Sequence, residues 1–251
     1  MGRNMITETD YNSRWWGAPF GKVTDADFFA LPPDQIRAQL APFSVVEFSA
    51  AENSATLAGQ LARAGFWWAD SQLSFRLNLR RFAKAEPPKH VARITLRSAR
   101  QAQFSIAADD LPLFKAERFL RLHGVKPARL AQRYANWAND LIAAHPDCCF
   151  EAFDGTRSIG WFLGRALNPS SIELTLAMSR PETTATGGQL YEAAQYAYAR
   201  LGFRLGQAAF SIHNTDVLNL YSHLGARFQA PTHFWFWQQP PAAMQEGGFA
   251  P

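Results

Sequence analysis

A phenol and a helix-capping amide lie near the end of the chain at a spacing that suits acid–base chemistry. Residues 211–228 have the sequence S-I-H-N-T-D-V-L-N-L-Y-S-H-L-G-A-R-F, in which Asn214 can begin a helix and Gly225 can end it. Tyr221 follows Asn214 by two helical turns, so both side chains project to nearly the same side. A phenol in that position can act as a general acid. The alternative role for Tyr221 is that of a core tyrosine on an amphipathic helix.

A loop between a strand and a helix is the second element with chemical potential. We expect a strand at 172–178 and a helix at 188–201, joined by the segment M-S-R-P-E-T-T-A-T-G-G-Q-L (178–190). Backbone N–H groups and the helix dipole at such an N-terminus favour a bound diphosphate. The segment is therefore a candidate site for a ligand that carries one.

Together the two elements resemble the Gcn5-related N-acetyltransferase (GNAT) superfamily. The segment from Asn214 resembles its N-x6-Y-x3-G-F signature, and Pro181-Glu182 with Gly187 resembles its pyrophosphate loop. The resemblance implies direct attack of an amine on an acyl-CoA thioester, with Tyr221 as general acid and no metal. The co-substrate would be acetyl-CoA or another acyl-CoA. The donor-binding residues implied by the resemblance are Leu174, Leu176, Met178, Thr184, Thr186, Gly187, Gly188 and Asn214.

The loop departs from the family pattern at two positions. Thr184 stands where Arg or Gln is usual, and Gln189 stands where a small residue is usual; Arg180 is a candidate for the missing charge. In the family, the preceding strand separates from the next one at a bulge, and the thioester lies in the gap. We expect the strand at 172–178 to behave in the same way and to present backbone groups to the pantetheine.

A closer resemblance covers nearly the whole chain. The segments 10–20, 61–70, 133–137 and 232–237 resemble those of dTDP-fucosamine acetyltransferase-like amino-sugar N-acyltransferases. This resemblance implies a small N-terminal α/β domain and a nucleotide-linked amino sugar as acceptor. It also makes Asp70 a candidate to bind the ammonium and take its proton.

Each candidate base has a plainer alternative. Asp70 could be a surface strand aspartate. His213 and His123 are weaker candidates, because a lone histidine is usually structural. No His, Cys or Asp spacing suggests a metal site.

The elements that must position these residues predict a mixed α/β (α+β) fold. We expect a small N-terminal α/β domain at 1–88, a GNAT domain at 89–238 and a disordered tail at 239–251. The run 84–90 (K-A-E-P-P-K-H) is interpreted as a linker, because its prolines interrupt regular structure. After it we expect, in order, a strand at 104–107, helices at 111–122 and from Pro127, three antiparallel strands, then helix, strand, helix and strand.

Composition narrows the class of protein further. Hydrophobic residues make up 47% of the chain and the formal net charge is +4, which fits a packed core and anionic ligands. Cys148 and Cys149 are adjacent, which excludes a disulfide framework and suggests reduced, buried thiols in a cytoplasmic protein. No apolar run of about 18 residues predicts a membrane span. Aromatic strands near the C-terminus would allow a homodimer.

Basic residues gather before and after the expected linker. The stretch contains Arg76, Arg80, Arg81, Lys84, Lys89, Arg93, Arg97 and Arg100. The simplest interpretation of these basic residues is a solvated strand edge. The functional alternatives are a phosphate-binding rim and a nucleic-acid patch, and we consider nucleic-acid binding the less favoured of the two. Arg76 or Arg80 could then meet the diphosphate of a sugar nucleotide.

Two other functions stay open from the sequence alone. The divergent loop allows a catalytically degenerate GNAT-like domain that serves as a binding or assembly module. A GNAT enzyme that acts on a peptide or small amine is the other alternative. The Asn214–Tyr221 pair separates the first alternative from an enzyme, because a binding module does not need a thiolate acid at that spacing.

Overall fold

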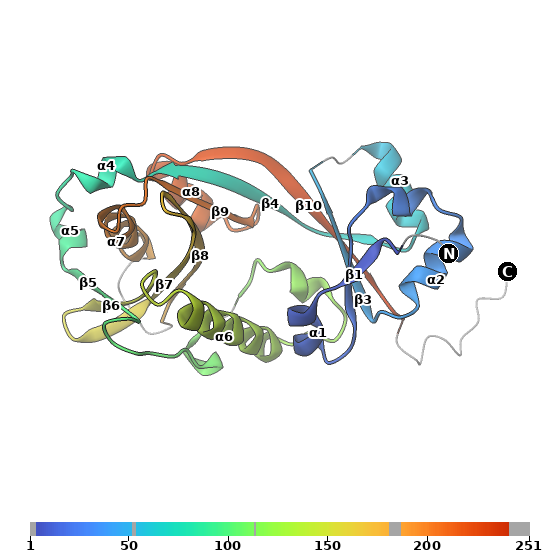
Figure 1. The fold of residues 1–251 in the computed structure, drawn as a ribbon, viewed down its shortest axis with the longest axis horizontal. Coiled ribbons are helices and arrows are strands. Elements are labelled where there is room, and N and C mark those ends of the chain that lie inside the picture. Colours follow the sequence, from blue (N-terminus) through green and yellow to red (C-terminus); the bar gives the residue numbers. More distant parts are fainter. Residues whose placement is uncertain (1–3, 52–53, 113, 181–186, 241–251) are drawn as a thin grey trace. The chain divides into compact units, whose positions relative to one another are not determined.

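The computed structural model describes residues 4–51, 54–112, 114–180 and 187–240, and these form two compact units (Figure 1). The first unit consists of the described residues up to Gln72, the short segment Arg118–Gly124, and those from Pro231 onward. The second unit consists of Leu73–Glu117 and Val125–Ala230. Both units are therefore discontinuous in sequence, which differs from the contiguous segments 1–88 and 89–238 that the sequence suggested.

The first unit is an α/β layer built on short strands. Its elements are β1 (Ile6–Glu8), α1 (Asp10–Trp16), β2 (Phe20–Val23), η1 (Ala26–Ala30), α2 (Pro33–Leu40), β3 (Val45–Ala50), α3 (Ala55–Arg63), the start of β4 (Trp67–Asn78), η3 (Arg118–Arg121) and the end of β10 (Arg227–Gln238). The strand order is β1-β2-β3-β10-β4. β3 pairs parallel with β2 and antiparallel with β10, so the last strand of the chain lies inside this layer.

Aromatic rings fill the core of the first unit. Phe29 packs edge-on against Phe48 and Phe66, with ring centroids 4.7 and 5.2 Å apart, and all three side chains are buried. Ser54 caps α3 by accepting a hydrogen bond from the amide of Leu57. A serine at this position satisfies one of the unpaired amides at the start of a helix.

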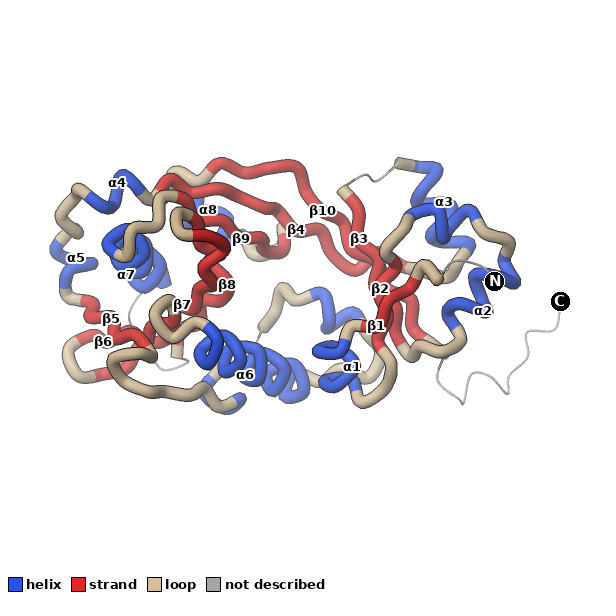
Figure 2. Tube along the Cα trace, viewed as in Figure 1, coloured by secondary structure: helices blue, strands red, loops and turns tan. Residues whose placement is uncertain are grey.

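The second unit carries the remaining elements. They are α4 (Arg80–Ala83), α5 (Lys89–Ala92), β5 (Ile94–Ser98), η2 (Ala108–Asp110), α6 (Pro127–Ala144), β6 (Cys149–Asp154), β7 (Arg157–Asn168), β8 (Ser171–Ser179), α7 (Gly187–Arg200), β9 (Leu205–Ser211) and α8 (Thr215–His223), with parts of β4 and β10. The strand order is β10-β4-β9-β8-β7-β6-β5, antiparallel from β5 to β8 and parallel between β8 and β9. Figure 2 shows the same strands in red. The mixed α/β prediction is confirmed.

Three sequence expectations in this unit were wrong. The strand is at Ile94–Ser98, not at 104–107. The described residues of 111–122 contain no α-helix, only the 3-10 turn η3, which belongs to the first unit. The expected linker at 84–90 contains the start of α5, because Pro88 suits the position before a helix as well as it suits a loop.

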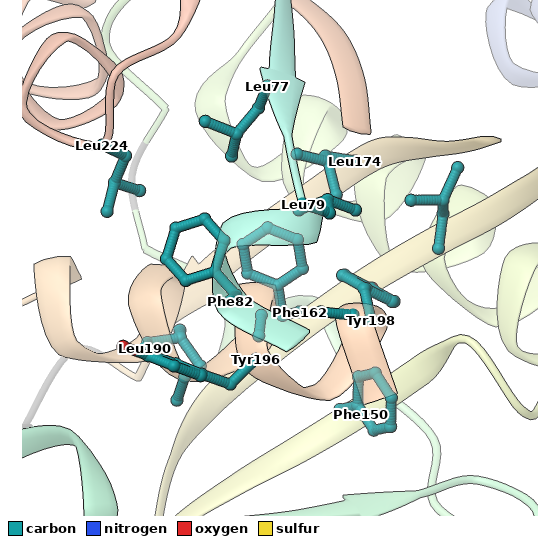
Figure 3. Close-up of a cluster of buried hydrophobic side chains, with 14 of the residues drawn as sticks. Leu77, Leu79, Phe82, Phe150, Phe162, Leu174, Leu190, Tyr196, Tyr198 and Leu224 are labelled. Carbon is teal, nitrogen blue, oxygen red and sulfur yellow. The ribbon is translucent and has the colours of Figure 1, made fainter. Parts of the chain in front are cut away.

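Helix α7 covers one face of the sheet and forms the core of the second unit with it (Figure 3). Leu190 and Tyr198 of α7 lie among Phe162 of β7, Leu174 of β8 and Leu77 of β4. The hydroxyl of Tyr198 donates a hydrogen bond of 2.8 Å to the carbonyl oxygen of residue 148. This packing holds α7, including its first turn, against β7 and β8.

Candidate active site

Strands β8 and β9 are paired only at one end. Their parallel ladder contains three residue pairs, Ser171 with Leu205, Ile172 with Gly206 and Glu173 with Gln207. β8 continues to Ser179, where its pairing is with β7. The separation that the sequence resemblance implied for this strand is therefore present in the structure.

A bulge lies where the separation begins. Leu174 pairs with Gly164 and Leu176 pairs with Leu163, so Thr175 is an extra residue on β8. A bulge of this kind bends a strand and reverses the faces to which the following residues point. Leu174 and Ala177 accordingly contact the core on the α7 side, one on each side of the bulge.

The separated part of β8 contains the three strand residues predicted to hold the donor. Leu174 and Met178 are buried and Leu176 is partly exposed, and all three pair with β7. Backbone N–H and C=O groups near the core require hydrogen-bond partners. Those on the β9 side of this strand could hold a ligand rich in amides, such as the pantetheine arm of coenzyme A.

Helix α8 has the predicted start and carries the predicted phenol. The side chain of Asn214 accepts a hydrogen bond of 3.3 Å from the amide of Val217, which caps the helix. Gly225 follows the helix with φ +70°, a conformation that glycine adopts without strain. Tyr221, two turns after the cap, is 3% exposed.

Three aromatic side chains surround the ring of Tyr221. Its centroid lies 4.0 Å from that of Phe75 on β4, 5.6 Å from that of Tyr191 on α7 and 6.4 Å from that of Phe210 on β9. Three elements besides α8 thus contact the ring. Tyr221 is therefore a core residue, as the structural alternative considered from the sequence expected.

Burial keeps both phenols of this group protonated. It raises the pKa of Tyr221 well above its usual value, and the neighbouring Tyr191 raises it further. Burial raises the pKa of Tyr191 to about 12. Both side chains therefore hold a proton at neutral pH, which is the state that a general acid requires.

The start of α7 lies beside α8. Gly187 and Gly188 are the first residues of α7, and a Cβ atom built on Gly188 would lie 3.4 Å from a methyl carbon of Leu220, next to Tyr221 in the sequence. The two helices that the resemblance implicates, one for the diphosphate and one for the proton, are therefore neighbours. Thr184 and Thr186 lie outside the described residues.

Arg180 does not have a free charge to offer to that segment. Its guanidinium donates hydrogen bonds to Asp110 at 2.7 Å and to Ser158 at 3.0 Å, lies 3.6 Å from a carboxylate oxygen of Glu151, and stacks 4.3 Å above the ring of Trp161. Two carboxylates balance its charge. The structure thus argues against Arg180 as a substitute for the missing basic residue of the loop.

The candidate bases are in different places. Asp70, on β4 in the first unit, is 3% exposed, so the alternative of a surface aspartate was wrong. Its neighbour Ser71 lies 2.7 Å from Nδ1 of His233. His123, also in the first unit, is exposed, whereas His213 directly precedes the cap of α8 in the second unit.

Sequence reasoning missed three residues that support Tyr221. Phe75 and Tyr191 contact its ring, and Arg81 donates a hydrogen bond to the carbonyl oxygen of Leu224 at the end of α8. A cation there satisfies an otherwise unpaired carbonyl and suits the negative end of the helix dipole. The alternation of β4 could have placed Phe75 in the core, but nothing local could have placed it beside α8.

Several basic residues of the stretch at 76–100 are already engaged. Arg93 pairs with Asp154 at 3.0 Å and Arg100 with Asp147 at 3.2 Å, while Arg97 stacks on the ring of Phe153. These three residues serve local structure. Arg76 and Arg80 are exposed and have no such contact among the described residues.

Solved structures with folds similar to this chain include GNAT proteins. A GCN5-related N-acetyltransferase from Sphaerobacter thermophilus superposes with a TM-score of 0.55 at 15% identity, covering 94% of this chain and 76% of that one. A tandem GNAT protein from the clavulanic acid biosynthesis pathway gives a TM-score of 0.53 at 13% identity, covering 90% of this chain and 77% of that one. A functionally unknown protein from Staphylococcus epidermidis gives a TM-score of 0.56 at 12% identity, covering 96% of this chain and 93% of that one.

The sequence matches no protein-family model, and no curated protein matches it significantly. The likeness to solved structures thus shows the fold of the GCN5-related N-acetyltransferases. Within the described residues, no helix has the length and apolar character needed to cross a membrane.

Proposed function

We propose that the protein is an N-acyltransferase that moves an acyl group from acetyl-CoA or another acyl-CoA to an amine. The observation that carries the proposal is the separation of β8 from β9 after Glu173, in the same unit as the buried phenol of Tyr221. GNAT proteins of the same fold are acetyltransferases by name, which supports this class of reaction.

The donor side of the proposed site comes from three elements of the second unit. Backbone groups of Leu174, Leu176 and Met178 would hold the pantetheine, and the side chain of Asn214 would contact it near the start of α8. The segment that ends with Thr184, Thr186, Gly187 and Gly188 would hold the diphosphate. An acyl-CoA bound there supplies an activated thioester carbonyl that an amine can attack directly.

The protein's own groups would handle the protons. Tyr221 donates its phenolic proton to the sulfur as the C–S bond breaks, so that the leaving group departs as a thiol. Asp70 accepts the proton that the amine must lose, directly or through water. The acceptor that we propose is the amino group of a nucleotide-linked amino sugar, on the basis of the sequence resemblance described above.

Calorimetric titration with acetyl-CoA, combined with thiol-release assays on dTDP-linked amino sugars, tests the proposal. We expect wild type and Tyr221→Phe to bind acetyl-CoA equally well, with turnover strongly reduced only in the variant. Tyr196→Phe is a matched control, because it removes a hydroxyl from another buried tyrosine of the same core, Tyr196 of α7, which packs on Phe82. Wild-type turnover in both variants would reject Tyr221 as the acid.

A second candidate function has one observation in its favour. The charge of Arg180 is balanced by two carboxylates, and the loop that it precedes lacks the usual basic residue. A GNAT-shaped binding module would show this combination. Failure of acetyl-CoA and longer acyl-CoAs to bind would favour that module over the enzyme, and turnover of small amines or peptides in place of amino sugars would correct the acceptor.

A further inference from the structure

Two tyrosine side chains from different helices are in contact within the second unit. Tyr191 lies about one turn after the glycines that begin α7, and Tyr221 lies on α8. Their ring centroids are 5.6 Å apart and the ring planes are inclined by 75°, which is the edge-to-face arrangement of aromatic rings in contact. Tyr191 also packs edge-on against Phe162 of β7, with ring centroids 5.2 Å apart. The ring of Tyr191 is therefore held between β7 and α8.

The other rings around Tyr221 are hydrocarbon. Of the three rings that contact it, those of Phe75 and Phe210 carry no polar atom, and only Tyr191 has a hydroxyl. Tyr221 is 3% exposed, so water covers little of its surface. A phenol in such surroundings keeps its proton readily, but the phenolate that remains after the proton is donated is costly, because burial disfavours the charged form. A general acid at this position therefore needs a group that stabilises its anion.

We propose that Tyr191 is a positioning residue for the acid, and that its hydroxyl donates a hydrogen bond to the oxygen of Tyr221 as that oxygen becomes a phenolate. This inference rests on the proposed function and adds a residue to it. As the C–S bond breaks, its electron pair stays on sulfur, and sulfur takes the proton of Tyr221. The negative charge then lies on the oxygen of Tyr221 until water returns a proton to it. Tyr191 keeps its own proton throughout.

The protonation state of Tyr191 and its place on α7 both suit this role. Burial raises the pKa of Tyr191 to about 12, so at neutral pH its side chain is a neutral hydrogen-bond donor. The start of the same helix lies beside Leu220, the residue before Tyr221. One helix would therefore bring both the diphosphate of the donor and the stabilising hydroxyl to the acid.

A double-mutant cycle with Tyr191→Phe tests the inference, because this change keeps the ring and removes only the hydroxyl. Thiol release from acetyl-CoA is measured with the dTDP-linked amino sugars, peptides and small amines named above as acceptors. We expect kcat to fall about ten- to hundredfold, the loss typical of one hydrogen bond to a charged group, with KM and acetyl-CoA affinity unchanged. In Tyr221→Phe, the same change should lower kcat no further, because the two groups act as a unit. Tyr196→Phe, on the same helix, should leave kcat unchanged.

The cycle separates this role from a role in packing. A change that only loosens the core would lower kcat by the same factor with and without the hydroxyl of Tyr221, and that result would overturn the inference. Wild-type kcat in Tyr191→Phe would overturn it as well, while turnover that depends on Tyr221 would leave the proposed function intact. If wild type releases no thiol with any of these acceptors, the proposed function fails and the role of Tyr191 fails with it.

Discussion

The rings of Phe75 and Tyr221 lie with their centroids 4.0 Å apart, tilted by 37°. Phe75 is fully buried on β4, so a strand of the sheet holds the side chain on α8 that we propose as the proton donor. The position of that phenol is therefore set by the core of the second unit and not by the helix alone.

Replacing Tyr221 with phenylalanine should separate catalysis from binding. Loss of a general acid typically lowers the rate by about 10²–10⁴-fold. We expect kcat of Tyr221→Phe to fall by that order, with KM and acetyl-CoA affinity unchanged, as measured by steady-state thiol release. An equal fall in acetyl-CoA affinity would instead show that the hydroxyl binds the donor.

The pH dependence of kcat should reflect the raised pKa of Tyr221. The active form is the protonated phenol, and burial raises its pKa well above its usual value of 10. The protonated form is therefore kept as pH rises, and we expect no loss of kcat from this group until above pH 10. A stopped assay of kcat from pH 7 to 10 checks this, and a decline that begins near pH 8 and disappears in Tyr221→Phe would contradict it.

Truncation of Phe75 should affect both stability and turnover. Phe→Ala changes in a core typically cost about 3–5 kcal/mol, and Phe75→Leu should cost less because it retains apolar volume. We expect denaturant unfolding to show a larger loss of stability for Phe75→Ala than for Phe75→Leu. We also expect kcat to fall further in Phe75→Ala than in Phe75→Leu. Phe29→Leu, a change in the core of the first unit, should destabilise the protein without a comparable loss of kcat in the remaining folded fraction.

The cap of α8 can be tested apart from its proposed contact with the donor. Removal of an Asn cap by alanine typically costs about 1 kcal/mol, whereas aspartate retains the capping oxygen. We expect Asn214→Ala to lower stability and Asn214→Asp to preserve it, with acetyl-CoA affinity reduced in both. Thermal melts and titration measure the two effects, and full acetyl-CoA affinity in both variants would remove Asn214 from the donor site.

Gly160 on β7 should tolerate no side chain. Its φ is +150°, and a Cβ atom there would lie 2.3 Å from the carbonyl oxygen of Met178 on β8. Because the clash is with backbone, we expect Gly160→Ala to cost at least about 1–3 kcal/mol, as overpacked sites do. A Cβ atom on Gly59 in α3 would lie 3.7 Å from a side-chain nitrogen of Arg63, an ordinary van der Waals contact, and we expect Gly59→Ala to stabilise the protein by about 0.5–1 kcal/mol. Urea titration of the wild type and both variants measures the two effects.

Both cysteines should be unreactive in the folded protein. Burial raises the pKa of Cys149 to about 12 and that of Cys148 less strongly, so little thiolate exists at pH 8. We expect no reaction with a thiol reagent in native protein and two equivalents in denaturant. Because the pKa of Cys149 is higher in the folded state, its contribution to stability is complete below about pH 9 and declines as pH rises toward 12.

The sequence was most informative where structure is local. The cap at Asn214, the helix end at Gly225 and the position of Tyr221 follow from short-range patterns, and the structure has them. The strand at Ile94–Ser98 was missed because its polar residues and the nearby prolines resemble a linker. The contact of Phe75 with Tyr221 joins residues 146 positions apart, a distance that no local periodicity encodes.

The position of β10 was the least predictable feature of the fold. It pairs with β3, and β4 is its other neighbour, although more than 140 residues separate it from either in the sequence. Hydrophobic alternation predicts that a strand exists, but not which strands it pairs with. The discontinuous units follow directly from this insertion.

The same insertion determines when each part of the protein can finish folding during synthesis. A growing chain leaves the ribosome with its N-terminus first, and N-terminal domains usually complete their fold before later ones. Here β3 and β4 emerge early but lack the strand that lies between them until residues 227–238 have been made. The part of the protein that is translated first is consequently among the last to be completed, and it must wait with two unmatched strand edges that a chaperone could shield.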